Sequence, residues 1–208
     1  MTDPRAKYAA EAARYDTRWA AYNRATLEML RPHLTARPPG RLLDLGCGTA
    51  NLALMLAGWG VRPELYLGVD PVPEMLRVAA DKLRDVPPSF PARLAAGEAG
   101  TLPVREAAFD TVVSASNLHY WPDPARGLDR VRAALRPGGR FLVVDWSRDT
   151  LRMKLRDRWL RLLGDRYHRV YTADECAGHL RAAGLRVRAL GRRGIPGGWE
   201  MLVAEAER

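Results

Sequence analysis

The chain has 208 residues, enough for a sizeable core, and we expect residues 1–208 to form a single domain. The two cysteines are too few for a disulfide framework or a metal cluster. The start of the chain lacks the apolar run of a signal peptide, and no stretch is apolar enough to span a membrane. The net charge of +9 comes from 30 arginines and 3 lysines spread along the chain, which favours a solvated surface over nucleic-acid binding. These properties predict a cytoplasmic protein without bound metal.

Helices and strands are predicted from hydrophobic period and turn residues. Residues 5–33 predict a helix with an aromatic stripe, ended by the segment 32–40. Strands are then predicted at 42–45, 65–70, 93–96, 111–114 and 139–145, and helices at 51–57, 74–83, 125–135, 151–163 and 173–183. Two final runs, 186–190 and 199–204, flank a turn of Gly and Pro and predict an antiparallel hairpin. The pattern is typical of an α/β protein with a doubly wound, Rossmann-like, mostly parallel seven-stranded sheet, an antiparallel last strand and helices on both faces.

Residues 41–51 are the most informative stretch, because an apolar run there ends in a Gly-x-Gly turn at Gly46 and Gly48 and a helix-forming run follows. Glycines can take positive φ and let a ligand approach the bare backbone. About twenty residues further on, a second apolar run ends at Asp70, where a carboxylate is placed to accept hydrogen bonds from ribose hydroxyls. We therefore expect a nucleoside site at the carboxyl edge of the sheet. The alternative is a tight turn without a ligand.

The kind of nucleoside is indicated by Asp44, two residues before the first glycine. A dinucleotide fingerprint would carry a small residue three positions after Gly48, but Asn51 stands there, and no nearby lysine or arginine serves a phosphate. An anion would repel a phosphate group, whereas it suits the ammonium and sulfonium of S-adenosyl-L-methionine (AdoMet). The pattern favours AdoMet over NAD.

Several segments in order resemble the class I AdoMet-dependent methyltransferases, especially the group that includes quinone-biosynthesis and other small-molecule methyltransferases. These segments are residues 43–49, 68–76, 97–103, 109–114, 118–123 and 135–139. The resemblance runs from about residue 8 to residue 203 and implies the strand order 3-2-1-4-5-7-6. Three residues depart from the common pattern. Ala50 replaces a frequent glycine, so we expect an ordinary negative φ there; Asn51 is expected to cap the next helix; and Glu98 stands where Asp is usual.

The resemblance also implies which residues bind the cofactor and the acceptor. The expected cofactor-binding residues are Asp44, Gly46, Cys47, Gly48 and Thr49 at the turn, Asp70 at the ribose, Pro71, Met75, Glu98 and Ala99 around the adenine, Ser114 and Ala115 near the methionine amino group, and Tyr15 as part of a lid. The expected acceptor-binding residues are Trp19, Asn117, Tyr120 and Trp121. Core packing is the alternative for Tyr15 and Trp19.

His119 follows the fourth predicted strand and is the candidate catalytic base. An imidazole with an unperturbed pKa of about 6.5 suits a proton acceptor. The alternative is that His119 only closes the pocket wall, because methyl transfer needs a base only when the acceptor must lose a proton.

Three regions surround the expected cofactor-binding core, residues 41–145. Residues 1–40 are expected to form a helical lid, residues 146–171 to cover the acceptor pocket, and residues 172–208 to supply a helix and the closing hairpin. In the cover segment, an apolar helical face is predicted to pack on the domain; its members are Leu151, Leu155, Trp159 and Leu162. The arginines of this segment are expected in water, the alternative being that a few attract an anionic acceptor.

The expected function is transfer of the AdoMet methyl group to an O, N or C nucleophile of a small-molecule acceptor, with S-adenosyl-L-homocysteine as the product. Three alternatives stay open: an RNA or protein methyltransferase, an AdoMet-binding protein without turnover, and an NAD oxidoreductase. The sequence carries no signal for the oligomeric state.

Overall fold

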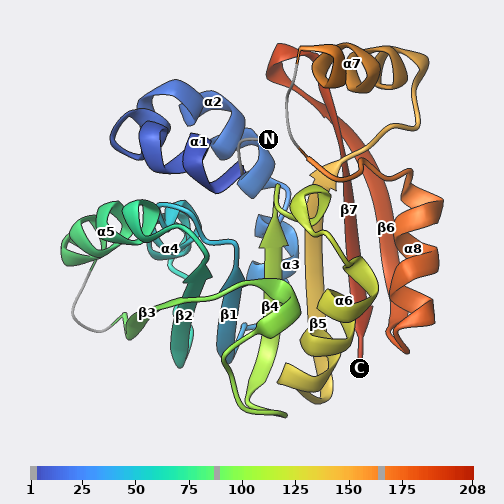
Figure 1. Ribbon diagram of the computed structural model, residues 1–208. Helices are drawn as coiled ribbons and strands as arrows, with labels where there is room; N and C mark the ends of the chain where they lie inside the picture. The colour runs from blue at the N-terminus through green and yellow to red at the C-terminus, as the bar shows by residue number, and fades with distance from the viewer. Residues whose placement is uncertain (1–3, 87–89, 164–166) are drawn as a thin grey trace.

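Seven strands form one sheet in the order β3-β2-β1-β4-β5-β7-β6 (Figure 1). The computed structural model describes residues 4–86, 90–163 and 167–208. The strands are β1 Arg41–Leu45, β2 Leu65–Asp70, β3 Ala92–Ala96, β4 Phe109–Ala115, β5 Leu135–Trp146, β6 Arg186–Ile195 and β7 Trp199–Glu207. Neighbours from β3 to β5 pair in parallel, and β7 runs antiparallel to both β5 and β6. The predicted fold class and strand order are confirmed.

Helices cover both faces of the sheet. They are α1 Pro4–Glu11, α2 Tyr15–Glu28, α3 Arg31–Ala36, α4 Asn51–Gly58, α5 Pro73–Lys82, α6 Pro124–Ala134, α7 Leu151–Leu162 and α8 Ala173–Ala182. Alternate residues of the central strands enter two different cores: Leu42 and Val113 pack with α3 and α4, whereas Leu43 and Val112 pack with α6 and α8. Burial on both faces explains why these strands are continuously apolar.

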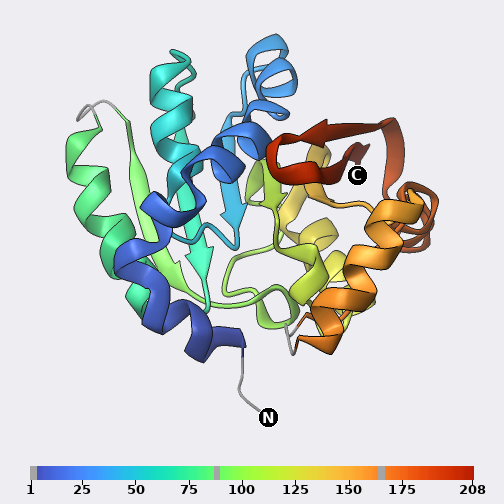
Figure 2. The same cartoon turned by 90° about the horizontal axis from the view of Figure 1, so that it is seen from above.

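The N-terminal region contains three helices rather than the one predicted over 5–33. A 3₁₀ turn, Ala12–Arg14, joins α1 to α2, and both helices lie across the carboxyl end of the sheet (Figure 2). Pro32 does not end a helix, because it lies in the first turn of α3, where its missing N–H costs no hydrogen bond.

Asp16 fastens α2 to the body of the molecule. Its carboxylate accepts hydrogen bonds from Thr49 Oγ1 at 2.7 Å, Asn51 Nδ2 at 2.9 Å and Lys82 Nζ at 2.7 Å. Burial raises the pKa of Asp16, but the hydrogen bonds from Lys82, Thr49 and Asn51 outweigh it, so that the pKa lies below its usual value. These contacts join α2 to the start of α4, at Asn51, and to the end of α5, at Lys82.

The apolar face of α7 points away from the molecule, so the prediction that it packs on the domain is wrong. The exposed fractions are 71% for Leu151, 61% for Leu155, 58% for Trp159 and 79% for Leu162. The helix packs instead through Met153, which is buried, and through Arg156, whose guanidinium carbon lies 3.8 Å from the centroid of the Trp199 ring. The stacked guanidinium occupies the inner side that the leucines were expected to fill.

Within the part of the chain that the structure describes, no helix combines the length and apolar character needed to cross a membrane. Among the same residues, no group of three His, Cys, Asp or Glu side chains is placed to hold a metal ion. Cys47 and Cys176 are both buried and free.

Candidate active site

The glycine turn after β1 has the geometry of a ligand cradle. Gly46 and Gly48 have φ values of +77° and +53°. The backbone N–H groups of Gly46 and Cys47 donate to the carbonyl of Val69 in β2, at 2.8 and 3.1 Å, which fixes the turn to the neighbouring strand. A Cβ at Gly46 would overlap the side chain of Asn117, whereas a Cβ at Gly48 would meet no atom within 4 Å. The turn therefore leaves open space beside Gly48.

Gly46→Ala should destabilise the fold. The left-handed conformation costs an L-residue about 1–2 kcal/mol, and the added methyl group would overlap the Asn117 amide. We expect urea unfolding to show a loss of at least ~1–2 kcal/mol. Gly58→Ala, at the end of α4 with no atom within 4 Å of the new Cβ, is the matched control and should be neutral or slightly stabilising. Equal stabilities of the two variants would contradict this account of the turn.

Asp70 ends β2 with its carboxylate directed at the turn. Oδ2 accepts a hydrogen bond from Gly48 N and Oδ1 accepts one from Val72 N, both at 2.9 Å. Burial raises the pKa of Asp70 more than these two hydrogen bonds lower it. The side chain also lines the cavity described below. Its remaining lone pairs are thus available to the hydroxyl groups of a ligand.

Ala50 adopts a left-handed conformation with φ +59°, so the predicted negative φ is wrong. Ala50 N donates to Cys47 O at 2.9 Å and Ala53 N donates to Ala50 O at 3.1 Å, which lets the turn pass directly into α4. Ala50 is fully buried, and the surrounding packing holds the strained backbone in place. The predicted cap is wrong as well, because the Asn51 side chain binds Asp16 and makes no capping hydrogen bond to α4.

Three of the predicted turn residues lie behind the cradle. Asp44 accepts a hydrogen bond from Tyr66 Oη at 2.6 Å in the core, and burial raises its pKa to about 7. A raised pKa means that Asp44 is partly protonated near neutral pH. Asp44 therefore attracts a cationic ligand less strongly than we expected from the sequence. Cys47 is buried, and the Thr49 hydroxyl is directed to Asp16. These three side chains pack behind the turn and do not line the cavity.

A cavity of about 300 Å³ lies beside the turn. The predicted residues that line it are Tyr15, Gly46, Gly48, Asp70, Pro71, Met75, Glu98, Ala99, Ala115, Asn117, Tyr120 and Trp121. Lining residues that the sequence analysis missed include Arg5, Tyr8, Val72, Arg126 and His168. Tyr8 belongs to the aromatic stripe of the N-terminal region, a signal that could have identified it. His168 had no such signal.

In the cavity lining, α1 meets the loop after β3. Arg5 of α1 forms an ion pair with the carboxylate of Glu98. Val72 and Met75, at the start of α5, are buried beside Asp70 and supply an apolar wall. This part of the lining combines apolar side chains with a charged pair.

Tyrosines from distant segments also meet in this lining, and two of them, Tyr8 and Tyr15, pack against Val72 and Met75. The hydroxyl oxygens of Tyr8 and Tyr120 are 2.8 Å apart, and their rings pack edge to face with centroids 5.6 Å apart. Burial raises the pKa of Tyr8 well above its usual value and that of Tyr15 to about 12. Both phenols therefore stay protonated near neutral pH and can donate hydrogen bonds.

His119 lies behind this wall rather than on it, in contrast to the predicted orientation. The ring is buried, with Nδ1 2.5 Å from Asp145 Oδ1, and it stacks on Trp146 at a centroid distance of 4.1 Å. Asp145 comes from β5, and its carboxylate holds the imidazole in the core. The backbone carbonyl of His119 accepts hydrogen bonds from the N–H groups of His168 and Arg169, at 2.8 and 3.2 Å. His119 thereby anchors the segment that brings His168 to the cavity.

Ser114 and Trp19 are two further predicted site residues that the structure places outside the cavity lining. Ser114 is fully buried, and its hydroxyl has no hydrogen-bond partner among the described residues. The Trp19 ring packs edge to face on Tyr22, with centroids 5.8 Å apart. Both side chains contribute to packing around the site.

Comparison with known proteins agrees with this geometry. The methyltransferase domain family matches residues 43–143, which run from β1 into β5. An uncharacterized methyltransferase of Mycobacterium tuberculosis is 40% identical over 125 residues, covering 60% of this chain and 45% of the relative. The demethylmenaquinone methyltransferase of Mycolicibacterium vanbaalenii is 33% identical over 132 residues, covering 62% of this chain and 50% of the relative. The chain thus spans about half the length of these curated relatives.

One solved structure extends the likeness over nearly the whole chain. It is a Burkholderia thailandensis 1,6-didemethyltoxoflavin-N1-methyltransferase with bound 1,6-didemethyltoxoflavin and S-adenosylhomocysteine. It has a TM-score of 0.73 and 25% sequence identity, and the match covers 98% of this chain and 86% of that one. The segment from residue 43 to residue 143 belongs to the methyltransferase domain family. The family predicted from the sequence is confirmed.

The cavity fits AdoMet. Open space beside Gly48 admits the methionine and sugar portions next to bare backbone, and Asp70 offers acceptor oxygens to two ribose hydroxyls. Met75 and Val72 offer the apolar surface that a purine requires. The cavity volume of about 300 Å³ lies at the lower end of the range of small-molecule sites.

Proposed function

We propose that the protein transfers the methyl group of AdoMet to a small organic acceptor. One observation carries the proposal: a single cavity is lined by the Gly48 turn and Asp70 and also by the tyrosine pair Tyr8 and Tyr120 and by His168. A donor site and an acceptor site that share one cavity are what an in-line displacement requires. Two relatives named for a small-molecule acceptor, demethylmenaquinone and 1,6-didemethyltoxoflavin, support a small molecule, whereas another relative, of Hahella chejuensis, is named for tRNA.

AdoMet, when bound, supplies a methyl group on a positively charged sulfur. The protein's part is to align the acceptor with this group and to exclude water, and orientation alone can lower a barrier by about 7–11 kcal/mol. The Gly46–Gly48 turn and Asp70 would hold the cofactor from β1 and β2. The α1 and α2 helices would close over it, fastened by Asp16.

The aromatic residues of the lining favour an acceptor with a flat ring that carries a polar substituent. Tyr8, Tyr120 and Trp121 present aromatic surfaces, and the two phenols present hydroxyl groups at the same place. If the acceptor loses a proton, we propose His168 as the base, because its side chain lines the cavity whereas that of His119 does not. The unprotonated nitrogen of an imidazole can accept such a proton.

The two free, buried cysteines, Cys47 and Cys176, support a working location in the reducing cytoplasm. We include this location in the proposal.

AdoMet and S-adenosylhomocysteine should stabilise the protein against heat. A ligand at 100 times its dissociation constant stabilises a fold by about 2.7 kcal/mol, and differential scanning fluorimetry should show the corresponding rise in melting temperature. NAD at the same concentration is the control and should have no effect. A shift with NAD and none with AdoMet would overturn the proposed cofactor.

A turnover assay with methyl-labelled AdoMet tests the acceptor class. We expect the label to appear in small molecules when the protein is incubated with pooled cell metabolites, and not in total RNA or total protein. Label in RNA or protein would overturn the proposed acceptor class. AdoMet binding with no labelled product in any of the three pools would favour a binding protein without turnover.

A further inference from the structure

The outward face of α7 is an apolar strip open to solvent. The strip consists of Leu151, Leu155, Trp159 and Leu162, spaced four, four and three residues apart, and each is more than half exposed. Leu163, directly after the helix, is 63% exposed and extends it. Scattered exposed leucines need no explanation, but a continuous strip on one helix face, centred on a tryptophan, indicates an interaction surface.

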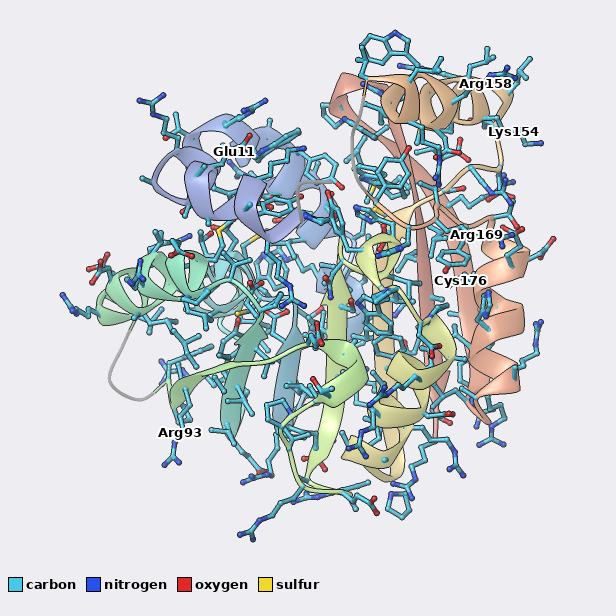
Figure 3. All side chains as sticks on the ribbon, viewed as in Figure 1. Glu11, Arg93, Lys154, Arg158, Arg169 and Cys176 are labelled. Atoms are coloured by element: carbon cyan, nitrogen blue, oxygen red, sulfur yellow. The ribbon has the colours of Figure 1, made fainter. Side chains whose placement is uncertain are left out.

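The charges around this strip are of one sign. Arg152 borders it on one side and Lys154 and Arg158 on the other, and all three are exposed. Figure 3 shows Lys154 and Arg158 on the outer side of α7. The helix has one acidic residue, Asp157, which turns inward to bind Tyr167 Oη at 2.7 Å. The exposed face of α7 therefore combines apolar side chains with positive charge only.

The positive charge beside the apolar strip indicates which kind of partner the strip binds. In a face-to-face pair of copies of this chain, the cations of one α7 would oppose those of the other, and like charges would repel. An anionic lipid surface matches both features, because its headgroups attract the arginines and lysine while the leucines and the tryptophan enter the boundary with the acyl chains. The chain's net charge of +9 acts in the same direction.

We propose that α7 docks the protein on the surface of an anionic lipid bilayer. The helix lies outermost at the carboxyl end of the sheet, with no other element above it (Figure 1). It is also joined to the cavity: Arg161 donates a hydrogen bond to His168 O at 3.1 Å, and His168 lines the cavity. Docking through α7 places the active site beside the lipid surface. The proposal does not depend on the proposed function, because lipid binding can be measured without cofactor or turnover.

Sedimentation with vesicles tests the proposal. The protein should bind large unilamellar vesicles of phosphatidylcholine with about 30 mol% phosphatidylglycerol, whose anionic headgroups give the vesicle a negative surface potential. It should bind pure phosphatidylcholine vesicles at least ~10-fold more weakly. The double variant Leu155→Ser, Trp159→Ser should bind the anionic vesicles at least ~10-fold more weakly. Leu190→Ser, at a leucine of β6 that is 37% exposed, is the matched control and should bind as the unmodified protein does.

A second pair of variants tests the charges. Lys154→Glu with Arg158→Glu should weaken binding at least ~10-fold, whereas Arg93→Glu with Arg130→Glu, exposed positions on β3 and α6, makes the same change in net charge and should have little effect. Unaltered melting curves would show that the variants are folded. Absence of binding by the unmodified protein, equal binding to both vesicle types, or unchanged binding by the α7 variants would each overturn the proposal. Self-association that the Leu155 and Trp159 changes abolish, without vesicle binding, would identify a second copy as the partner instead.

Discussion

Asp70→Ala should raise the dissociation constant of AdoMet by about 30- to 1000-fold. The carboxylate lines the cavity at the end of β2 and is placed to accept charge-assisted hydrogen bonds from two ribose hydroxyls. Losing such bonds costs roughly 2–4 kcal/mol. The change can be measured by isothermal titration calorimetry. Asp70→Asn should cost less, because one acceptor oxygen remains.

The substitution also removes the acceptor for Gly48 N and Val72 N, so some loss of stability is expected in the protein without ligand. Unfolding in urea measured alongside the calorimetry separates the two effects: the loss of binding energy should exceed the loss of folding energy. Asp129→Ala, at an exposed acid of α6, is the surface control and should change neither. Unchanged AdoMet affinity in Asp70→Ala would reduce Asp70 to a residue that holds the turn.

His119→Ala should destabilise the protein by about 3–5 kcal/mol, because it leaves the buried Asp145 carboxylate without its imidazole partner. The same change removes a ring that stacks on Trp146. Chemical denaturation monitored by circular dichroism measures the loss. Asp145→Asn with His119 intact should also be destabilising, since the charge that faces the imidazole is gone.

His168→Ala is the comparison that tests which histidine serves the reaction. Its side chain lines the cavity, so we expect little loss of stability and a lower rate, by about 10²-fold or more if the acceptor must lose a proton. AdoMet affinity should stay the same. The assignment of His168 as the base is wrong if His119→Ala is as stable as the unmodified protein but loses turnover. His119 would then reach the acceptor after a rearrangement of the residues between it and the cavity.

The sequence alone predicted the position of the candidate cofactor site. The Gly46–Gly48 turn and the acid at Asp70 are local signals: each lies at the end of an apolar run, and parallel strands bring their carboxyl ends to one edge. The alternation of strands and helices along the sequence predicted the fold class, because continuously apolar strands are typical of a parallel sheet that is covered on both faces. The local backbone was less predictable, as the left-handed Ala50 shows.

Which histidine reaches the cavity was decided only by the tertiary structure. His119 follows β4 where a catalytic residue would be sought, yet Asp145 from β5, adjacent in the sheet, holds its ring in the core. His168 follows α7 and reaches the cavity because its backbone bonds to the carbonyl of His119. Contacts between residues so far apart in sequence leave no periodic pattern to read.

The orientation of α7 shows the same limit. The helical spacing of Leu151, Leu155 and Trp159 shows that they share a face of the helix. It does not show whether that face points to the core or to solvent. The structure packs the opposite side, where Met153 is buried and Arg156 stacks on Trp199 of the closing hairpin. A helix with apolar residues on two sides can bury only the side that its neighbours can contact, and those neighbours are set by the fold.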